Sequence, residues 1–200
     1  MVKQVITFPE FSGIRCLMMP YIQGDPGSVP QTYAPYSDII ESVFLKKGDL
    51  GFLTIDESSA RQGQPHRGDR AKFGRAIHTE AGKHPDNFTY RWAWGRSGVV
   101  SLDRGVKILL ANNLEGSCAL WDAEHEDTSI DGDIGHVADQ YPYDAATLMK
   151  VGEVHEIGIL TPHESLPVTQ DFKRQFLRII SSGVHGREEY FTENPLVGFA

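Results

Sequence analysis

Glycine and proline interrupt this chain so often that they leave little room for long helices. The 20 glycines and 11 prolines are spread along 200 residues. The apolar segments between them are short, and few keep the i, i+3, i+4, i+7 spacing of a helix for more than two turns. Short apolar runs bounded by turn residues are typical of strands, so we predict a mainly β protein. The candidate strands cover residues 50–55, 72–79, 87–94, 106–111, 117–121, 151–161 and 174–181.

Strands of this number and length suffice for a sandwich, a jelly roll or a barrel. A helix is predicted over residues 36–46, where Ser37 can act as the cap, and a further turn or two around residues 144–150. The chain shows no internal repeat and no linker, so we expect a single domain over residues 1–200. The residues that share the apolar face of the predicted helix are Ile39, Ile40, Val43 and Phe44.

Charge and cysteine content exclude several classes of protein. With 27 acidic and 19 basic residues the net charge is −8, so we expect neither nucleic acid nor an anionic membrane surface as a partner. Cys16 and Cys118 are far apart and no CxxC pair occurs, which excludes a zinc ribbon and a disulfide framework. Because no apolar run reaches the length of a membrane span and no secretion signal is readable, the expected location is the reducing cytoplasm.

Two polar segments, residues 58–70 and 122–140, interrupt the strand pattern. The second is dense in aspartate and glutamate but lacks the ligand order and the closing glutamate of an EF-hand, so we expect a solvated loop. In the first, Arg67 and Arg70 are candidates to hold an anionic group of a substrate, although a solvated loop is the simpler interpretation.

Three histidines each open an H-x-acid triplet. A strand alternates its two faces with period two, so residues i and i+2 project to the same side and can bind one metal ion. A single triplet is weak evidence in a chain that has eight histidines. The triplets are His78-Thr79-Glu80, His84-Pro85-Asp86 and His125-Glu126-Asp127.

A later part of the chain gives these triplets a context. Residues 152–168 read as a strand that leads to His163, and residues 174–180 read as a strand that opens with Arg174, eleven residues further on. Upstream, residues 106–121 hold two apolar runs joined by an Asn/Gly turn. In these features the chain resembles the Fe(II)/2-oxoglutarate-dependent oxygenases, over roughly residues 72–181. Members of this family carry an arginine a short distance after the distal histidine of a double-stranded β-helix.

The resemblance implies that His78, Glu80 and His163 bind Fe(II) and are the catalytic centre, with 2-oxoglutarate as cosubstrate. The triplet at His78 has the His-Thr-acid form found in the taurine dioxygenase and clavaminate synthase branches. His84 and Asp86 stay open as an alternative ligand pair. Two imidazoles and one carboxylate on one face of Fe(II) leave coordination positions for a 2-oxo acid and O₂.

His125 does not fit this ligand set. It precedes His163 by only 38 residues, too few for the strands that the family fold places between its two histidines. His155 is interpreted as structural, because eight residues of strand separate it from His163 by about 26 Å. An aromatic stripe on one strand is predicted as sheet core or as the wall of a substrate pocket; it consists of Phe88, Tyr90, Trp92 and Trp94.

The resemblance further implies that Arg174 binds the distal carboxylate of 2-oxoglutarate, with Arg178 on the same strand face as the second candidate. The planar guanidinium binds a carboxylate through two parallel hydrogen bonds. The implied fold is a mainly β double-stranded β-helix, that is a cupin-like jelly roll, with a few flanking helices. Residues 72–181 form its core, and residues 1–71 contribute strands and a helix packed on that core.

These observations lead to the hypothesis of a non-haem iron oxygenase that oxidises an unidentified small-molecule or amino-acid-like substrate. One alternative is a cupin-like metal enzyme that keeps His78, Glu80 and His163 but does not use 2-oxoglutarate. Another is a non-catalytic jelly-roll binding protein, since a fold does not by itself imply a function. The sequence leaves the oligomeric state open.

Overall fold

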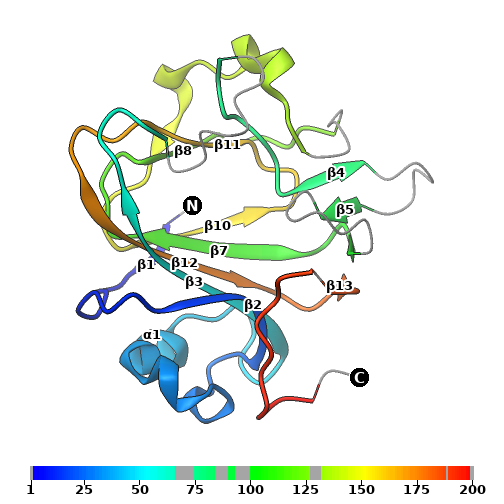
Figure 1. The fold of residues 1–200 in the computed structure, drawn as a ribbon. Helices are drawn as coiled ribbons and strands as arrows, with labels where there is room; N and C mark the ends of the chain where they lie inside the picture. The colour runs from blue at the N-terminus through cyan, green and yellow to red at the C-terminus, as the bar shows by residue number, and fades with distance from the viewer. Residues whose placement is uncertain are drawn as a thin grey trace.

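The structure is a computed structural model that describes residues 2–65, 74–83, 90–92, 100–126, 132–187 and 189–198. It is mainly β, with antiparallel sheets and few helices, as the sequence predicts (Figure 1). None of the helices in these ranges is both long and apolar enough to cross a bilayer.

The large sheet has six strands in the order β1-β10-β7-β12-β3-β2, and each strand is antiparallel to its neighbours. Strands that are more than a hundred residues apart in the sequence lie side by side in it, because β3 pairs with β12. In chain order the strands are β1 (Val2–Val5), β2 (Arg15–Ile22), β3 (Leu50–Ala60), β7 (Lys107–Asn112), β10 (Glu153–Gly158) and β12 (Phe172–Ile180).

Two smaller sheets complete the fold. The first has the order β11-β8-β9 and lies across from the large sheet (Figure 1). Its strands are β8 (Cys118–Leu120), β9 (Thr147–Leu148) and β11 (His163–Ser165). The second has the order β13-β6-β5-β4, with strands β4 (Ala81–Lys83), β5 (Tyr90–Trp92), β6 (Ser101–Leu102) and β13 (Val184–His185).

Alternation along the strands divides the apolar side chains into three buried clusters. Leu177 and Ile179 of β12 face outward and pack with Ile39 and Ile40 under the helical segment that covers the large sheet. Ile180, on the other face, packs between the sheets with residues of β7 and β10. A third cluster, around Trp121, fills the outer side of the β11-β8-β9 sheet. The space between the sheets is therefore flanked by packed layers on both sides.

The helices are shorter than the sequence predicts. The helix expected over residues 36–46 is α1 (Ser37–Ser42), preceded by the 3-10 helix η2 (Gln31–Tyr36). Ser37 is not its cap, because Tyr36 holds that position, and the helix stops where Val43 is extended. Around residues 144–150 there is one 3-10 turn, η5 (Tyr143–Ala145), before β9. The described residues also include the 3-10 helices η1 (Pro26–Ser28) and η4 (Gly135–Gln140).

Some strand predictions need correction. Of the predicted strand 72–79, residues 74–79 form no ladder and pair only through bridges at His78. The polar segment 58–70 starts inside β3, which continues to Ala60. In the acidic segment, residues 132–140 are not a solvated loop: Asp133 is buried, and η4 covers the third cluster. Residues 66–73, 84–89, 93–99 and 127–131 lie outside the described part of the chain.

Candidate functional site

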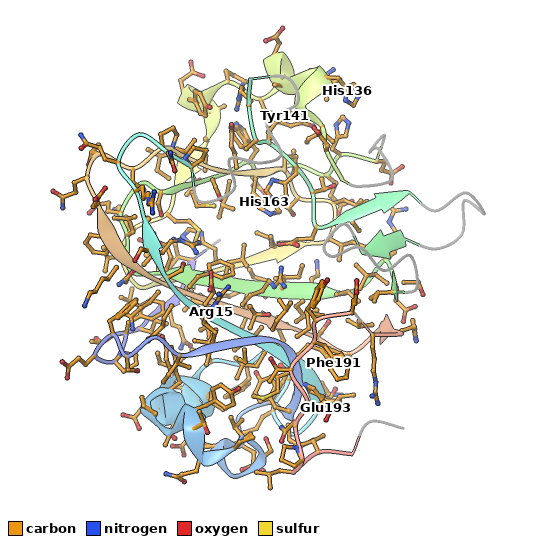
Figure 2. All side chains as sticks on the ribbon, viewed as in Figure 1. Arg15, His136, Tyr141, His163, Phe191 and Glu193 are labelled. Atoms are coloured by element: carbon orange, nitrogen blue, oxygen red, sulfur yellow. The ribbon has the colours of Figure 1, made fainter. Side chains whose placement is uncertain are left out.

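A cavity of about 500 Å³ opens between β3 and β12 of the large sheet and the two segments that carry His78 and His163. Figure 2 shows His163 projecting into the space between the sheets. Five residues that the family resemblance implies as site residues all line this one cavity. They are His78, Glu80, His163, Arg174 and Arg178.

Backbone pairing places the two histidines opposite each other. His78 N–H donates to the His163 carbonyl, and His163 N–H donates to the His78 carbonyl, both at 2.9 Å. Directly paired residues in antiparallel strands project to the same side. The two imidazole rings accordingly lie together, with their centroids 4.2 Å apart, and both side chains are buried.

The side chain of Glu164 stabilises the pairing of the two segments that carry His78 and His163. The Glu164 carboxylate accepts hydrogen bonds from the Ala76 N–H at 2.9 Å and from Arg75, whose Nη2 lies 2.7 Å from Oε2. Arg75 also stacks its guanidinium on Tyr143 at 4.2 Å. A buried carboxylate with these partners ties the segment before His78 to β11, so the position of one histidine fixes the position of the other.

Each imidazole is oriented by a backbone carbonyl. His78 Nδ1 lies 2.7 Å from the Ala76 carbonyl, and His163 Nδ1 lies 2.9 Å from the Thr161 carbonyl. A carbonyl only accepts, so Nδ1 carries the hydrogen in both rings and the lone pair of the neutral imidazole is on Nε2. This arrangement is the usual second-layer contact of histidines that bind metals through Nε2.

Glu80 is the third polar group at this point of the cavity and is 1% exposed. Its Oε1 lies 3.4 Å from His163 Nε2, and its Oε2 lies 3.3 Å from Arg178 Nη1. The two oxygens of one carboxylate therefore face different partners.

The chemistry of these side chains fits a divalent transition metal. In the described part of the chain, however, no three His, Cys, Asp or Glu side chains lie close enough together to hold one ion as they stand. Imidazole nitrogens and a carboxylate are ligands that Fe(II) and its neighbours accept. Two ligands about 2.1 Å from one ion and at right angles are about 3 Å apart. The separation of 3.4 Å between His163 Nε2 and Glu80 Oε1 is close to that value. A metal would take the place of this direct contact.

Arg174 brings a buried positive charge to the same cavity. Its side chain is 6% exposed, and its Nη1 has no hydrogen-bond partner within the described residues. Burial lowers the pKa of the guanidinium to about 10, and nearby Cys118 and Asp56 oppose this shift, so the group is charged at neutral pH. Phe176 supports the guanidinium from one side, with its ring centroid 4.6 Å away. A buried cation with an unsatisfied donor has the charge and the free hydrogen-bonding capacity to bind an anion.

Arg178 lies four residues further along β12 and is fully buried. Besides Glu80 it contacts Thr54, whose Oγ1 lies 3.4 Å from Nη2. The two arginines share one strand face, as the sequence predicts, but their surroundings differ. Arg178 is engaged by a carboxylate, whereas Arg174 has no carboxylate within hydrogen-bonding contact among the described residues.

Other residues weighed in the sequence lie elsewhere or outside the description. His125 is away from the cavity lining and contacts the Tyr141 hydroxyl at 2.7 Å. His155 is buried in β10 beside Glu153, and burial lowers its pKa. Outside the described residues lie His84 and Asp86, Arg67 and Arg70, and Phe88 and Trp94; the side chains of Tyr90 and Trp92 are also not described.

Several residues of the cavity wall were missed in the sequence. Thr54 and Asp56 come from β3, while Arg15 and Leu17 come from β2. The C-terminal segment adds Thr192, which is held to Leu17 by two hydrogen bonds of 2.7 and 2.9 Å (Figure 2 labels its neighbours Phe191 and Glu193). Strand alternation on β3 marks Thr54 and Asp56 as one face, but only the pairing of β3 with β12 shows that this face lines the cavity.

Comparisons with known proteins do not assign a family. No protein-family model matches the chain, and no curated protein matches it. A search of solved structures found one described as "Crystal Structure of EvdMO1", with 14% sequence identity and a TM-score of 0.36. The match covers 78% of this chain and 31% of that chain, so the present chain spans about a third of its length. A similarity at this level carries no argument about function.

Proposed function

We propose that this protein is a non-haem Fe(II)- and 2-oxoglutarate-dependent oxygenase that oxidises a second, small-molecule substrate. One observation carries the proposal: two histidines and a glutamate line the same cavity as a buried arginine whose Nη1 has no hydrogen-bond partner in the described part of the chain. The two histidines and the glutamate fit a metal ion, and the arginine fits the anionic group of a cosubstrate that binds beside the metal.

The arrangement of the strands supports a double-stranded β-helix as the finer fold. From β7 onward the strands alternate between the two facing sheets: β7 is in the large sheet, β8 and β9 in the small one, β10 in the large, β11 in the small and β12 in the large. The bridge between His78 and His163 extends the small sheet on its other side. This back-and-forth course is what a jelly roll requires.

His78, Glu80 and His163 would hold Fe(II), with the histidines binding through Nε2. Bound Fe(II) would let O₂ oxidise 2-oxoglutarate to succinate and CO₂, with one oxygen atom of O₂ going to succinate and the other to the oxidation of the second substrate. The carbonyls of Ala76 and Thr161 keep both rings in the tautomer that offers Nε2. Because the ligands are buried, the protein also keeps bulk water away from the reacting groups.

Arg174 would bind the distal carboxylate of 2-oxoglutarate. A carboxylate that loses its water on entering the cavity needs a charged partner there, because a buried charge without one is strongly unfavourable. The unsatisfied Nη1 of Arg174 supplies a donor at that place. The guanidinium and the carboxylate would each satisfy the other.

The test is the anaerobic addition of Fe(II) and then 2-oxoglutarate to the purified protein, followed by visible absorption. We expect a weak metal-to-ligand charge-transfer band that requires both additions and is absent in His163→Ala. Binding of Fe(II) without this band would favour a cupin-like metal enzyme, and the absence of Fe(II) binding would favour a non-catalytic binding protein. Either result would overturn the proposal.

A further inference from the structure

We infer that Arg178 is a positioning residue that holds the Glu80 carboxylate, so that a single oxygen of Glu80 faces His163. This inference rests on the metal site of the proposed function. It assigns Arg178 a different role from Arg174: the anion of the cosubstrate is left to Arg174 alone.

The two oxygens of the Glu80 carboxylate contact different side chains. Oε2 is held by Arg178 Nη1 at 3.3 Å, and Oε1 is directed to His163 Nε2 at 3.4 Å. Both charged side chains are almost completely buried, at 0% and 1% exposure. In such surroundings an ion pair of this geometry is screened little by water and can fix the orientation of the carboxylate.

A glutamate needs such support more than an aspartate would. Its side chain has one more rotatable bond, and each torsion that must be fixed costs conformational entropy. Without a partner for Oε2, rotation about the last torsion would let the two oxygens exchange places or face a metal together. Arg178 removes this freedom, because its partner atom is at a defined place on β12.

The arginine is itself fixed through its second branch. Nη2 donates to Thr54 Oγ1 at 3.4 Å, and the same oxygen accepts the Met18 N–H at 3.1 Å. Met18 has φ of +48°, at the irregularity in the pairing of β2 with β3. In this backbone conformation the Met18 N–H points to Thr54 on the neighbouring strand β3. The planar guanidinium presents Nη1 to Glu80 and Nη2 to Thr54 at a fixed separation, which the single nitrogen of a lysine does not reproduce.

The test measures Co(II) affinity of the metal-free protein in the absence of 2-oxoglutarate, by titration followed through visible absorption. Residues that orient a metal ligand typically change metal affinity about 10–100-fold when replaced. We expect a weakening of that size for Arg178→Met. The matched control is Arg174→Met, the same chemical change on the same face of β12 but with no contact to Glu80, and we expect it to change Co(II) affinity less than threefold.

A second variant, Arg178→Lys, keeps the positive charge and is therefore less disruptive to folding. Far-ultraviolet circular dichroism checks that both Arg178 variants are folded. The lysine variant should bind Co(II) about three to ten times more weakly than the wild-type protein, because one nitrogen does not reproduce the fixed separation of the two guanidinium donors. Folded Arg178 variants with unchanged Co(II) affinity would overturn the inference and leave the proposed function standing. If the wild-type protein binds no Co(II), both the inference about Arg178 and the proposed function are overturned. Metal binding without any response to 2-oxoglutarate would overturn only the oxygenase proposal.

Discussion

Arg174 is the residue on which the choice between an oxygenase and a simpler metal enzyme depends. If its guanidinium binds the cosubstrate, Arg174→Ala should raise the 2-oxoglutarate concentration needed for half-maximal succinate formation at least tenfold. Loss of about 1.4 kcal/mol of binding free energy already gives that factor. The affinity for Co(II) should stay within threefold. Lys173→Ala, an exposed neighbour on the opposite strand face, is the control. An unchanged concentration dependence in Arg174→Ala would contradict the assignment.

Glu57 is a buried carboxyl whose charge is used for stability rather than for chemistry. Oε2 accepts the N–H groups of Ser12 and Ile14, and Oε1 accepts hydrogen bonds from Tyr36 and Gln175, all between 2.8 and 2.9 Å. Burial alone would raise the pKa of this carboxyl, but the hydrogen bonds outweigh it and leave the pKa below the ordinary value of 4.5. Because the folded pKa is lowered, the stabilisation is present above pH 4.5 and is lost as the pH falls through the folded pKa.

Replacing this carboxyl should therefore change how stability depends on pH. We expect Glu57→Gln to be less stable at pH 7 by about 1.5–3 kcal/mol, the value of hydrogen bonds to a charged group. Between pH 5 and pH 3 (about the range in which carboxyls titrate) the variant should lose less stability than the unchanged protein. Urea unfolding at a series of pH values measures both, with Glu41→Gln on the exposed side of α1 as control. If the free energy of unfolding changes with pH in the same way for Glu57→Gln and for the wild-type protein, the prediction is wrong.

At the scale of elements, the turn before β10 depends on a glycine. Gly152 has φ of +71°, its carbonyl accepts the Ile6 N–H, and a Cβ placed on it would lie 2.1 Å from the Ile6 carbonyl oxygen. We expect Gly152→Ala to destabilise the protein by about 3 kcal/mol or more, from backbone strain together with the clash. Gly48→Ala has a similar φ of +85° and no atom within 4 Å of the new Cβ, so it should lose only the strain, about 1–2 kcal/mol. Urea unfolding measures the loss in the free energy of unfolding for both variants. Equal losses would show that the clash at residue 152 does not contribute.

The sequence predicted central strands better than edges. β7, β8, β10 and β12 lie within the predicted ranges or within a few residues of them, because buried strands are apolar runs between turn residues. β1 was missed because it is short, polar and largely exposed, and β9 because its two residues are both exposed. α1 was overextended because Val43 and Phe44 continue the helical spacing, whereas Val43 is buried in an extended conformation.

For the candidate site, the motif residues were predictable and their surroundings were not. The spacing from His163 to Arg174 and the triplet at His78 pointed to residues that line one cavity. Nothing in the local sequence indicated that Arg178 would contact Glu80, because that contact depends on where segments almost a hundred residues apart meet. The same holds for Thr192 beside Leu17, which the tertiary fold alone brings together.

At the scale of the whole molecule, binding of a metal to the folded chain should raise its thermal stability. At a Co(II) concentration about 100 times the dissociation constant the stabilisation is about 2.7 kcal/mol. For a chain of this size that corresponds to an increase in melting temperature of about 5–10 °C. The increase should disappear in His163→Ala. A similar increase in that variant would mean that Co(II) binds somewhere else, and no increase in the unchanged protein would argue against a metal site.

The pairing of β3 with β12 also determines how this chain must fold. Phe52 pairs with Ile180 and Ala60 with Phe172, so every one of these contacts closes a loop of more than a hundred residues. Such non-local pairing slows folding to the range of about milliseconds to seconds, because loop entropy is lost before the contacts form. During synthesis β3 can pair at once with β2, but its other neighbour, β12, is made more than a hundred residues later. Because β12 is the last strand of the large sheet in chain order, the wall that carries Arg174 and Arg178 completes that sheet.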